Sequence, residues 1–323
     1  MGRPSDIDLS LANIWKSWYN FRKGKRNSLV ILEFEWHLED QLINLHLDLN
    51  QQSYRHGQYD HFIVNDTKRR DIAVANVRDR VVHRLLYDYL VQVCDSRFDH
   101  DVWSCRVGKG NTAALQRVTQ LLKKYPRGYV WRADVQKFFD NVDQAVLIKL
   151  LRGYDLGKEA TLLLDDVICS YSITGQTGIP IGNLTSQILA NVYLHEFDHY
   201  VRHSLKPLGY TRYGDDFILI GKTKEDAIDF QSLGSDFLAS RLRLSLHAQN
   251  NVIMPVRGGL RYLGVTTFLL GTTLSKKTYN NINDKLAGKN YDSYLSYVNH
   301  YASDKQKAIM NSNRLDPLGN SLI

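Results

Sequence analysis

The stretch "TRYGDDFILIG", Thr211 to Gly221, places two adjacent carboxylates, Asp215 and Asp216, between two runs of β-prone residues. A Gly-Asp pair between such runs is typical of a tight hairpin turn, because both residues tolerate the positive φ angles that two-residue turns need. Two acids at one end of a hairpin are also suited to catalysis. The stretch alone is compatible with both interpretations, and the rest of the chain has to distinguish them.

A third acid, Asp134, lies in "GYVWRADVQKFFDNVD", residues 128–143, which begins as a strand, reaches Asp134 at its end and continues as an amphipathic helical stretch. Ligands commonly approach a sheet at such a strand end, although a solvated strand end is the alternative for this acid alone. If the strand lies beside the hairpin, Asp134, Asp215 and Asp216 converge with no neighbouring cation to neutralise them.

Converging carboxylates of this kind suit Mg²⁺, which keeps several waters and shares its coordination with substrate phosphates. Two such ions about 3.5–4 Å apart stabilise both the attacking and the leaving oxygens of a phosphoryl displacement. The three acids therefore predict a two-magnesium site for nucleotidyl transfer.

The composition agrees with a nucleic-acid partner without establishing one. The 323 residues include 41 Lys+Arg and 34 Asp+Glu, a formal net charge of +7, and a mild basic excess attracts polyanions. Three scattered cysteines, Cys94, Cys105 and Cys169, predict neither a disulfide framework nor a CxxC zinc site. No run approaches the ~20 apolar residues of a membrane span, and the start lacks an apolar signal core. These features predict a cytoplasmic protein with no membrane partner.

Hydrophobic periodicity predicts helices over 9–20 and 28–49, the second capped by Ser28, and over 77–93 and 112–124. Short β-prone runs at 62–64 and 72–75 predict a hairpin with Lys68, Arg69 and Arg70 near its tip. Strand alternation places Lys68 and Arg70 on the same side. The later Gly108-Lys109-Gly110 lacks the earlier glycine and following Ser/Thr of a phosphate-binding P-loop.

Three motifs together resemble, in order and spacing, the palm motifs of reverse transcriptases: "DVQKFF" from Asp134, "GIPIGNLTSQILANVYLHEFD" at 178–198, and "RYGDD" at 212–216. "KRRDIAVANVRDRVVH" resembles the fingers motif of the bacterial members, and "RGGLRYLG" at 257–264 the strand turn that grips the primer. The resemblance implies an α+β, right-hand polymerase. Residues 1–125 would form N-terminal helices and fingers, 126–268 the palm with part of the fingers interleaved, and 269–323 a short helical thumb.

The resemblance also implies roles for individual residues. Asp134, Asp215 and Asp216 would be the catalytic, metal-binding acids, with Asp216 the least certain ligand, and Val135 would complete the site for two Mg²⁺ ions. Fingertip cations close on the incoming triphosphate in this family, and charge-assisted contacts to phosphate suit that task. Lys68 and Arg70 are the residues in those positions.

Further nucleotide-binding residues are implied around the sugar and base, with Val135 among them. Phe139 resembles the bulky gate that rejects a ribose 2′-OH, although plain core packing is its alternative because Phe138 is its neighbour. Gly182 permits close backbone approach, Asn183 is a candidate helix cap, and Ile181 and Gln187 flank these positions.

The form "IGNLTSQ" differs from the "QG...SP" form of retroviral and intron enzymes and resembles the enzymes of diversity-generating retroelements. That resemblance implies an RNA-directed DNA polymerase that copies a template RNA into adenine-mutagenised cDNA from dNTPs, with a small basic accessory protein. A stand-alone, defence-associated antiviral reverse transcriptase remains an alternative. An inactive RNA-binding module on the same scaffold is another, which the intact aspartates argue against.

Two features near the C-terminal end complete the expectations. Many relatives carry lysines where this chain has Gln249 and Asn250, so a basic group that protonates pyrophosphate is expected elsewhere or not at all. In the thumb, four tyrosines recur at helical spacing, and periodic aromatics favour helix packing over a duplex-contacting stripe. They are Tyr291, Tyr294, Tyr297 and Tyr301.

Overall fold

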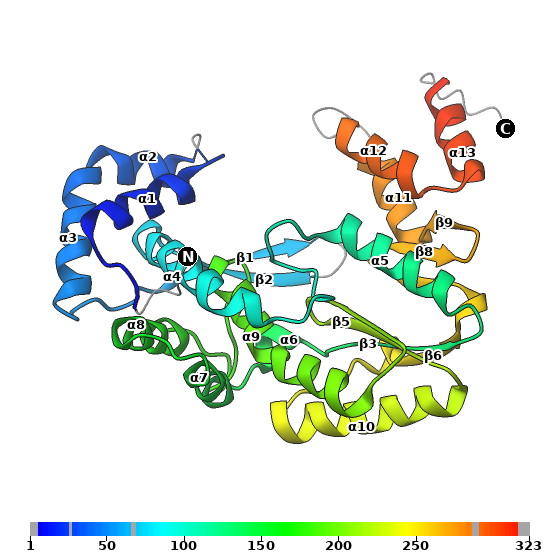
Figure 1. Cartoon of the computed structure of the whole chain (residues 1–323). Helices are drawn as coiled ribbons and strands as arrows, with labels where there is room; N and C mark the ends of the chain where they lie inside the picture. The colour runs from blue at the N-terminus through cyan, green and yellow to red at the C-terminus, as the bar shows by residue number, and fades with distance from the viewer. Residues whose placement is uncertain (1–5, 26–27, 66–68, 286–290, 316–323) are drawn as a thin grey trace. The chain divides into compact units, whose positions relative to one another are not determined.

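The computed structural model describes residues 6–25, 28–65, 69–285 and 291–315 (Figure 1). Helices and antiparallel strands mix along the chain, so the expected α+β class is confirmed. The chain divides into two compact units. The first comprises Met1–His100, Val135–Ser204 and Gly234–His247, and the second Asp101–Asp134, Leu205–Leu233 and Ala248–Ile323. The sequence-derived fingers, palm and thumb boundaries stay a prediction.

The first unit consists of helices around one two-stranded hairpin. Its helices are α1 (Leu11–Arg22), α2 (Leu29–Trp36), α3 (Leu38–Asn50), α4 (Val77–Cys94), α6 (Phe138–Asn141), α7 (Gln144–Arg152), α8 (Lys158–Cys169) and α9 (Leu184–Tyr200), with a 3-10 turn at Asp95–Arg97. Its strands are β1 (Tyr59–Asn65) and β2 (Arg69–Ala75), paired antiparallel as expected. A π-helical turn, Val201–Leu205, and helix α10, Lys224–Leu242, run along the chain from one unit into the other.

Helices α4 and α9 form the centre of the first unit. Helix α4 contacts both α1 and α9, and its buried side chains include Val81 and Leu85. Helix α9 is buried around most of its circumference, including Thr185, Ser186 and Asn191, which is typical of a central helix. Helix α4 follows β2, which carries Arg70, and α9 follows the loop that carries Ile181 and Gly182.

The expected single helix over 28–49 is wrong, because the structure has two helices there. Helix α2 ends at Trp36 and α3 starts at Leu38, with His37 in a non-helical conformation at φ −119° and ψ 32°. No proline or glycine marks this break in the sequence. Ser28 occupies the N-cap position of α2, but its side chain makes no capping hydrogen bond.

The second unit contains two antiparallel sheets and flanking helices. The first sheet has the order β4-β5-β3-β6 and the second the order β7-β8-β9. The strands are β3 (Tyr129–Asp134), β4 (Gly209–Tyr213), β5 (Asp216–Gly221), β6 (Val252–Pro255), β7 (Leu260–Tyr262), β8 (Val265–Phe268) and β9 (Gly271–Leu274). The helices are α5 (Asn111–Lys124), α11 (Lys276–Lys285), α12 (Tyr291–Tyr301) and α13 (Asp304–Leu315), with 3-10 turns at Ala248–Asn250 and Val256–Gly258.

One hydrophobic core joins the elements of the second unit. It includes Leu122 of α5, Ile218 of β5 and Val265 of β8, together with side chains of α11 to α13. Tyr301 is buried in this core, and Tyr294 and Tyr297 pack against it, so the expected helix packing is confirmed for these three. The side chain of Tyr291 lies outside the described residues.

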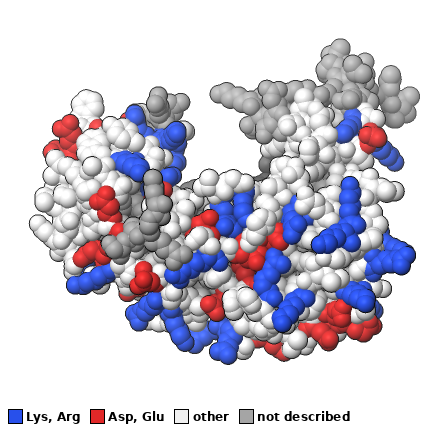
Figure 2. All heavy atoms as spheres, in the orientation of Figure 1, with Lys and Arg blue, Asp and Glu red and all other residues white. Residues whose placement is uncertain are grey.

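The surface charges and the cysteines are the last features of the fold that the composition concerned. Basic side chains are spread over the face shown in Figure 2, with acidic groups among them. Cys94, Cys105 and Cys169 are not joined in disulfides, and Cys94 is buried. Burial raises the pKa of the Cys105 and Cys169 thiols. Within the described ranges, the structure contains no helix with the length and apolar character that crossing a membrane requires.

Candidate active site

The stretch that carries the paired acids is a two-residue hairpin turn. Tyr213 of β4 pairs with Asp216 of β5, which leaves Gly214 and Asp215 as the two turn residues. Gly214 has a φ of +63°, and a glycine in the first central position is typical of a type II′ turn. The turn interpretation is therefore confirmed, and Asp215 lies at the tip while Asp216 begins the strand.

The turn is fixed from the β4 side by buried polar groups. The Gly214 N–H donates to Ser104 Oγ at 2.8 Å, and Arg212 Nη1 donates to the Gly214 carbonyl at 2.8 Å. The Arg212 backbone in turn bonds to Asp101 and Trp103, at 2.9 Å each. Residues 101–104 therefore cover the edge of β4 and hold the position of Asp215.

Asp134 lies next to the hairpin as the sequence predicted. Strands β3 and β5 are antiparallel, with Asp134 directly opposite Asp216, and two like charges in that arrangement repel each other. Asn250 Nδ2 donates to Asp134 Oδ2 at 3.1 Å. At the position where many relatives carry a basic group, this chain therefore places an amide that orients the carboxylate.

The surroundings of Asp215 disfavour the charged form of its carboxyl group. Burial, followed by the nearby charge of Asp134, raises the pKa of Asp215 to about 7. A buried carboxylate next to another acid favours protonation unless a cation offsets both charges. A cation bound beside Asp134 and Asp215 would therefore stabilise the carboxylate form of Asp215.

Asp216 differs from the other two acids, because a cation is already bound to it. Arg132 Nε donates to Asp216 Oδ1 at 3.1 Å and Arg132 Nη2 donates to Oδ2 at 2.7 Å. Burial raises the pKa of Asp216 to about 6, against the opposing effect of the Arg132 hydrogen bonds and charge. The expectation that no cation neutralises the three carboxylates is wrong for Asp216.

The donors of the second unit fit a hard divalent cation. In the portion of the chain that is described, no three His, Cys, Asp or Glu side chains form a group that could hold a metal ion. Asp134 and Asp215 supply carboxylate oxygens, and Mg²⁺ is commonly held by one or two carboxylates plus waters and substrate phosphates. The oxygen-only donor set of Asp134 and Asp215 therefore fits Mg²⁺ that shares its coordination with waters and a substrate phosphate.

In the first unit, the hairpin β1–β2 carries Arg70, one of the two cations expected to contact phosphate. Arg70 lies on β2 opposite Val64 and is exposed, while Lys68 lies outside the described residues. On β1, Phe62 and Ile63 are about half exposed, at 50% and 51%. The end of this hairpin therefore presents both guanidinium and apolar groups.

The loop before α9 is bonded to β2. Ala73 N–H donates to the Ile181 carbonyl at 3.2 Å, Ala75 N–H donates to Asn183 Oδ1 at 3.3 Å, and Asn183 Nδ2 donates to the Ala73 carbonyl at 2.7 Å. Asn183 occupies the N-cap position of α9 without a capping bond, so its expected capping role is wrong. Its amide is used instead to fix the loop to the hairpin.

Gly182 is required by this loop. Its φ is +108°, and a Cβ there would lie 2.8 Å from Ile72 Cγ2 of β2. The backbone at Gly182 therefore lies close to strand β2, and a larger side chain at this position would collide with that strand. Gln187, on the first turns of α9, is exposed, and Ile181 is half-buried, so both side chains retain surface for a ligand.

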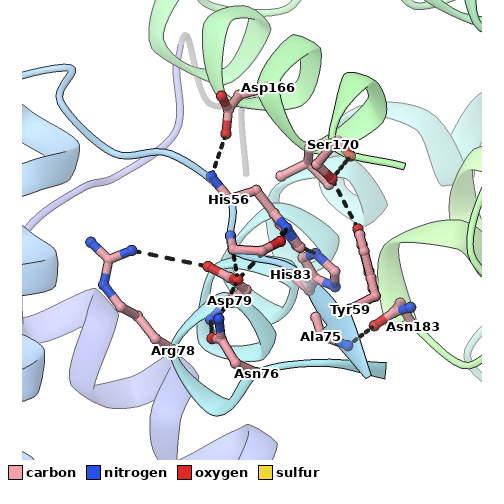
Figure 3. A network of polar contacts seen from close by, with 12 residues as sticks. His56, Tyr59, Ala75, Asn76, Arg78, Asp79, His83, Asp166, Ser170 and Asn183 are labelled. Atoms are coloured by element: carbon pink, nitrogen blue, oxygen red, sulfur yellow. Dashed lines mark hydrogen bonds and ion pairs between the residues drawn. The ribbon is translucent and has the colours of Figure 1, made fainter. Parts of the chain in front are cut away.

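A buried polar network supports the base of the same hairpin (Figure 3). The fully buried Asp79 accepts hydrogen bonds from Tyr54 Oη, Gly57 N–H and Asn76 Nδ2, at 2.7–2.8 Å. His56 and His83 meet through their Nε2 atoms at 3.0 Å. The network holds the segment that leads into β1 against the start of α4.

The remaining predicted residues follow Asp134 along the chain. Val135 is buried and forms an antiparallel bridge with Leu246. Phe138 is 3% exposed, whereas Phe139 is half-buried and touches Phe138 edge-on, with ring centres 5.3 Å apart. Phe138 is thus the core residue of the two.

Sequence reasoning did not find Arg132, Asn250 as a partner of Asp134, or Ser104. For Arg132 a signal existed, because residues two apart on a strand share a face, and Arg132 precedes Asp134 by two. For Ser104 no local signal existed, since it meets Gly214 across 110 positions of the sequence.

Comparison with known proteins identifies the family of the chain. The sequence model of the family described as "Reverse transcriptase (RNA-dependent DNA polymerase)" matches residues 60–267. Since the match covers more than half of the chain, the protein belongs to this reverse transcriptase family.

Individual relatives are more distant. The chain is 25% identical to protein YkfC of Escherichia coli over 238 residues, covering 61% of this chain and 62% of that protein. It is 27% identical to the group II intron-encoded protein LtrA of Lactococcus lactis over 146 residues, covering 42% of this chain and 24% of LtrA. The chain therefore spans less than two thirds of the length of these curated relatives.

Proposed function

We propose that the protein is an RNA-directed DNA polymerase, which extends a primer on a template RNA with dNTPs to give cDNA. The observation that carries this proposal is the juxtaposition of Asp134 at the end of β3 with the hairpin turn that carries Asp215, in a reverse transcriptase domain, where burial and the charge of Asp134 raise the pKa of Asp215. Bound Mg²⁺ ions would stabilise the attacking and leaving oxygens of nucleotidyl transfer. Asp134, Asp215, Asp216 and Val135 are the proposed metal-site residues, with Asp216 the weakest candidate because Arg132 occupies its carboxylate.

The residues of the first unit are proposed to bind the incoming dNTP. Lys68 and Arg70 would contact its triphosphate, because guanidinium and ammonium groups form strong charge-assisted hydrogen bonds with phosphate. Phe139 would restrict the space at the sugar 2′ position. Exposed Gln187 and half-buried Ile181, held by the loop with Gly182, would contact the nucleotide.

Replacement of Asp215 tests the catalytic assignment. Asp215→Asn removes one negative charge with little change of shape, so primer extension with Mg²⁺ and dNTPs should fall at least about a thousandfold, a barrier increase of roughly 4 kcal/mol. Binding of the primed RNA template, measured by fluorescence anisotropy, should stay within about twofold of wild type. Extension by Asp215→Asn at the wild-type rate would contradict the proposal.

We further propose that the enzyme serves a diversity-generating retroelement in the cytoplasm, with a small basic accessory protein and error-prone copying at template adenines. The motif "IGNLTSQ" supports this subclass. Neighbouring genes provide the discriminating observation. A variable-protein gene with a near-repeat beside this gene agrees with the retroelement role, whereas its absence beside an intact polymerase activity favours an antiviral enzyme.

A further inference from the structure

Helix α2 is apolar on two opposite faces, although a helix of this kind is normally buried on all sides. Six of its eight residues are apolar. On one face Ile31 is 1% exposed, and the rings of Phe34 and Trp18 of α1 have their centres 5.1 Å apart. Beside them, Glu35 forms an ion pair with Arg22. These contacts fix α2 at the periphery of the first unit (Figure 1).

The opposite face of α2 exposes large apolar side chains to solvent. Leu29, Leu32 and Trp36 recur at the spacing of one helical face, and they are 81%, 47% and 84% exposed. Val30, beside them, is 56% exposed. Single exposed apolar residues are ordinary, whereas several that gather in one place typically mark an interaction site. These four side chains, the α2 stripe, therefore have the character of a contact surface.

The charges around the α2 stripe change sign along the chain. Residues 9–26 contain five Lys or Arg and no Asp or Glu, whereas residues 27–54 contain five Asp or Glu and no Lys or Arg. Lys23 is exposed ahead of the helix, Glu33 is exposed within it, and Glu39 is exposed just after it. The α2 stripe thus lies between a basic end and an acidic end.

This charge pattern discriminates among candidate partners. The acidic end would repel a nucleic acid or an anionic lipid surface, and the basic end would repel a uniformly basic protein. A second copy of the chain suits both ends, because two antiparallel α2 helices bring the basic end of each beside the acidic end of the other. In that arrangement Leu29 of each copy lies toward Trp36 of the other, and Leu32 lies near the two-fold axis.

We propose that two copies of the chain associate through their α2 stripes, packed antiparallel about a two-fold axis. The inference goes beyond the proposed polymerase function and does not depend on it, since none of the residues of the α2 stripe belongs to the candidate active site. One face of an eight-residue helix offers less than the roughly 800 Å² that each partner of a stable interface buries. The dimer should therefore be weak, with a Kd on the order of 10 μM.

Sedimentation equilibrium of the full-length protein, after nuclease treatment to remove bound RNA, tests the proposal. Wild type should shift from monomer toward dimer between about 1 and 100 μM. Leu32→Lys places two like charges near the two-fold axis, so this variant should dimerise at least about thirtyfold more weakly. Leu162→Lys makes the same exchange at a position 45% exposed in α8 and should keep the self-association of wild type.

A pair of charge reversals tests the antiparallel arrangement. Lys23→Glu and Glu39→Lys should each weaken the dimer about threefold to tenfold, because each places like charges where two ends meet. The double variant again has opposite charges at these ends, so its affinity should return to within about threefold of wild type. A parallel arrangement does not predict this recovery, because it places each end beside the same end of the other copy.

Three results would overturn the proposal. One is a protein that stays monomeric up to about 100 μM, and another is a dimer that Leu32→Lys leaves intact, since the contact would then lie on another surface. The third is self-association that nuclease treatment abolishes, which would identify RNA as the bridge between copies. Should Leu32→Lys fail to fold, the charge reversals at exposed positions decide, and a double variant that does not recover rejects the proposal.

Discussion

At the residue scale, Phe138 and Phe139 show how one backbone turn separates two identical side chains. Phe138 is buried and packs edge-on toward Tyr193, with ring centres 6.2 Å apart. Phe139 is half-buried, and its backbone carbonyl accepts from Ile179 N–H at 2.9 Å. Core packing by Phe138 leaves the ring of Phe139 available for a role at a substrate.

Phe139→Val tests that role. If the ring excludes a 2′-OH, the smaller side chain should raise the kcat/KM ratio of ribonucleotides to dNTPs by about 10-fold to 100-fold, because a steric contact of this size is worth about 1–3 kcal/mol. Single-nucleotide incorporation assays measure the ratio. Phe138→Leu is the matched control, expected to lower stability without a change in sugar preference. An unchanged ratio in Phe139→Val would identify the ring as a packing residue.

At the element scale, the position of the β1–β2 hairpin depends on the polar groups that bind its base and its second strand. Its base rests on the network around Asp79, His56 and His83, and β2 is bonded to the loop before α9 through Asn183. Isolated two-stranded hairpins are marginally stable. The network and the Asn183 amide therefore determine where Arg70 is held.

His83 makes this support sensitive to acid. Burial, and then the charges of His56 and Arg80, lower the pKa of His83 to about 3, against about 6.5 in an unfolded chain. Between these two pKa values the unfolded chain therefore binds a proton at His83 that the folded chain does not bind. The contribution of His83 to the free energy of unfolding is fully present above pH 6.5. It decreases as the pH falls toward 3, by at most about 1.4 kcal/mol per pH unit.

His83→Gln should remove this dependence, because an amide can still hydrogen-bond to His56 and does not titrate. We expect the free energy of unfolding of the variant to fall less steeply between pH 7 and pH 5 than that of wild type, as measured by urea unfolding. His37→Gln, at an exposed position, should keep the wild-type slope. Equal slopes for wild type and His83→Gln would show that another group controls the acid response.

At the scale of the whole molecule, copying fidelity is the property that distinguishes the proposed roles. Ile181 stands where the retroviral pattern has glutamine, and its apolar, β-branched side chain offers no hydrogen bond to a nascent base pair. Its backbone is fixed by Ala73, so the identity of the side chain can change without release of the loop. Weaker polar selection should then permit more mispairs.

Sequencing of cDNA made by the wild type, with any required accessory protein, should show misincorporation concentrated opposite template adenines. Ile181→Gln should reduce these errors about tenfold if the amide restores ~1.4 kcal/mol of discrimination. Ile228→Gln makes the same exchange at a position 45% exposed in α10 and should leave the error spectrum unchanged. Uniformly accurate copying by the wild type would reject the retroelement role and favour the antiviral alternative.

Local periodicity predicted much of the architecture. Alternation and turn chemistry located β3, the β1–β2 hairpin and the turn at Gly214, and the 3.6-residue period located α4 and α5. The same signals missed the break at His37, because no residue type there opposes a continuous helix. Asn183 was also misassigned, since an asparagine before a helix has the same local pattern whether it caps the helix or bonds to a distant strand.

The sequence by itself determined the α+β class, the family and the positions of Asp134, Asp215 and Asp216, because each depends on residue type and on spacing along the chain. Tertiary structure decided which acid is neutralised. Arg132 reaches Asp216 across 84 positions of sequence, and Tyr262 reaches it across 46. Hydrogen bonds and burial between strands depend on register and sheet order, and only the folded chain brings these groups within bonding distance.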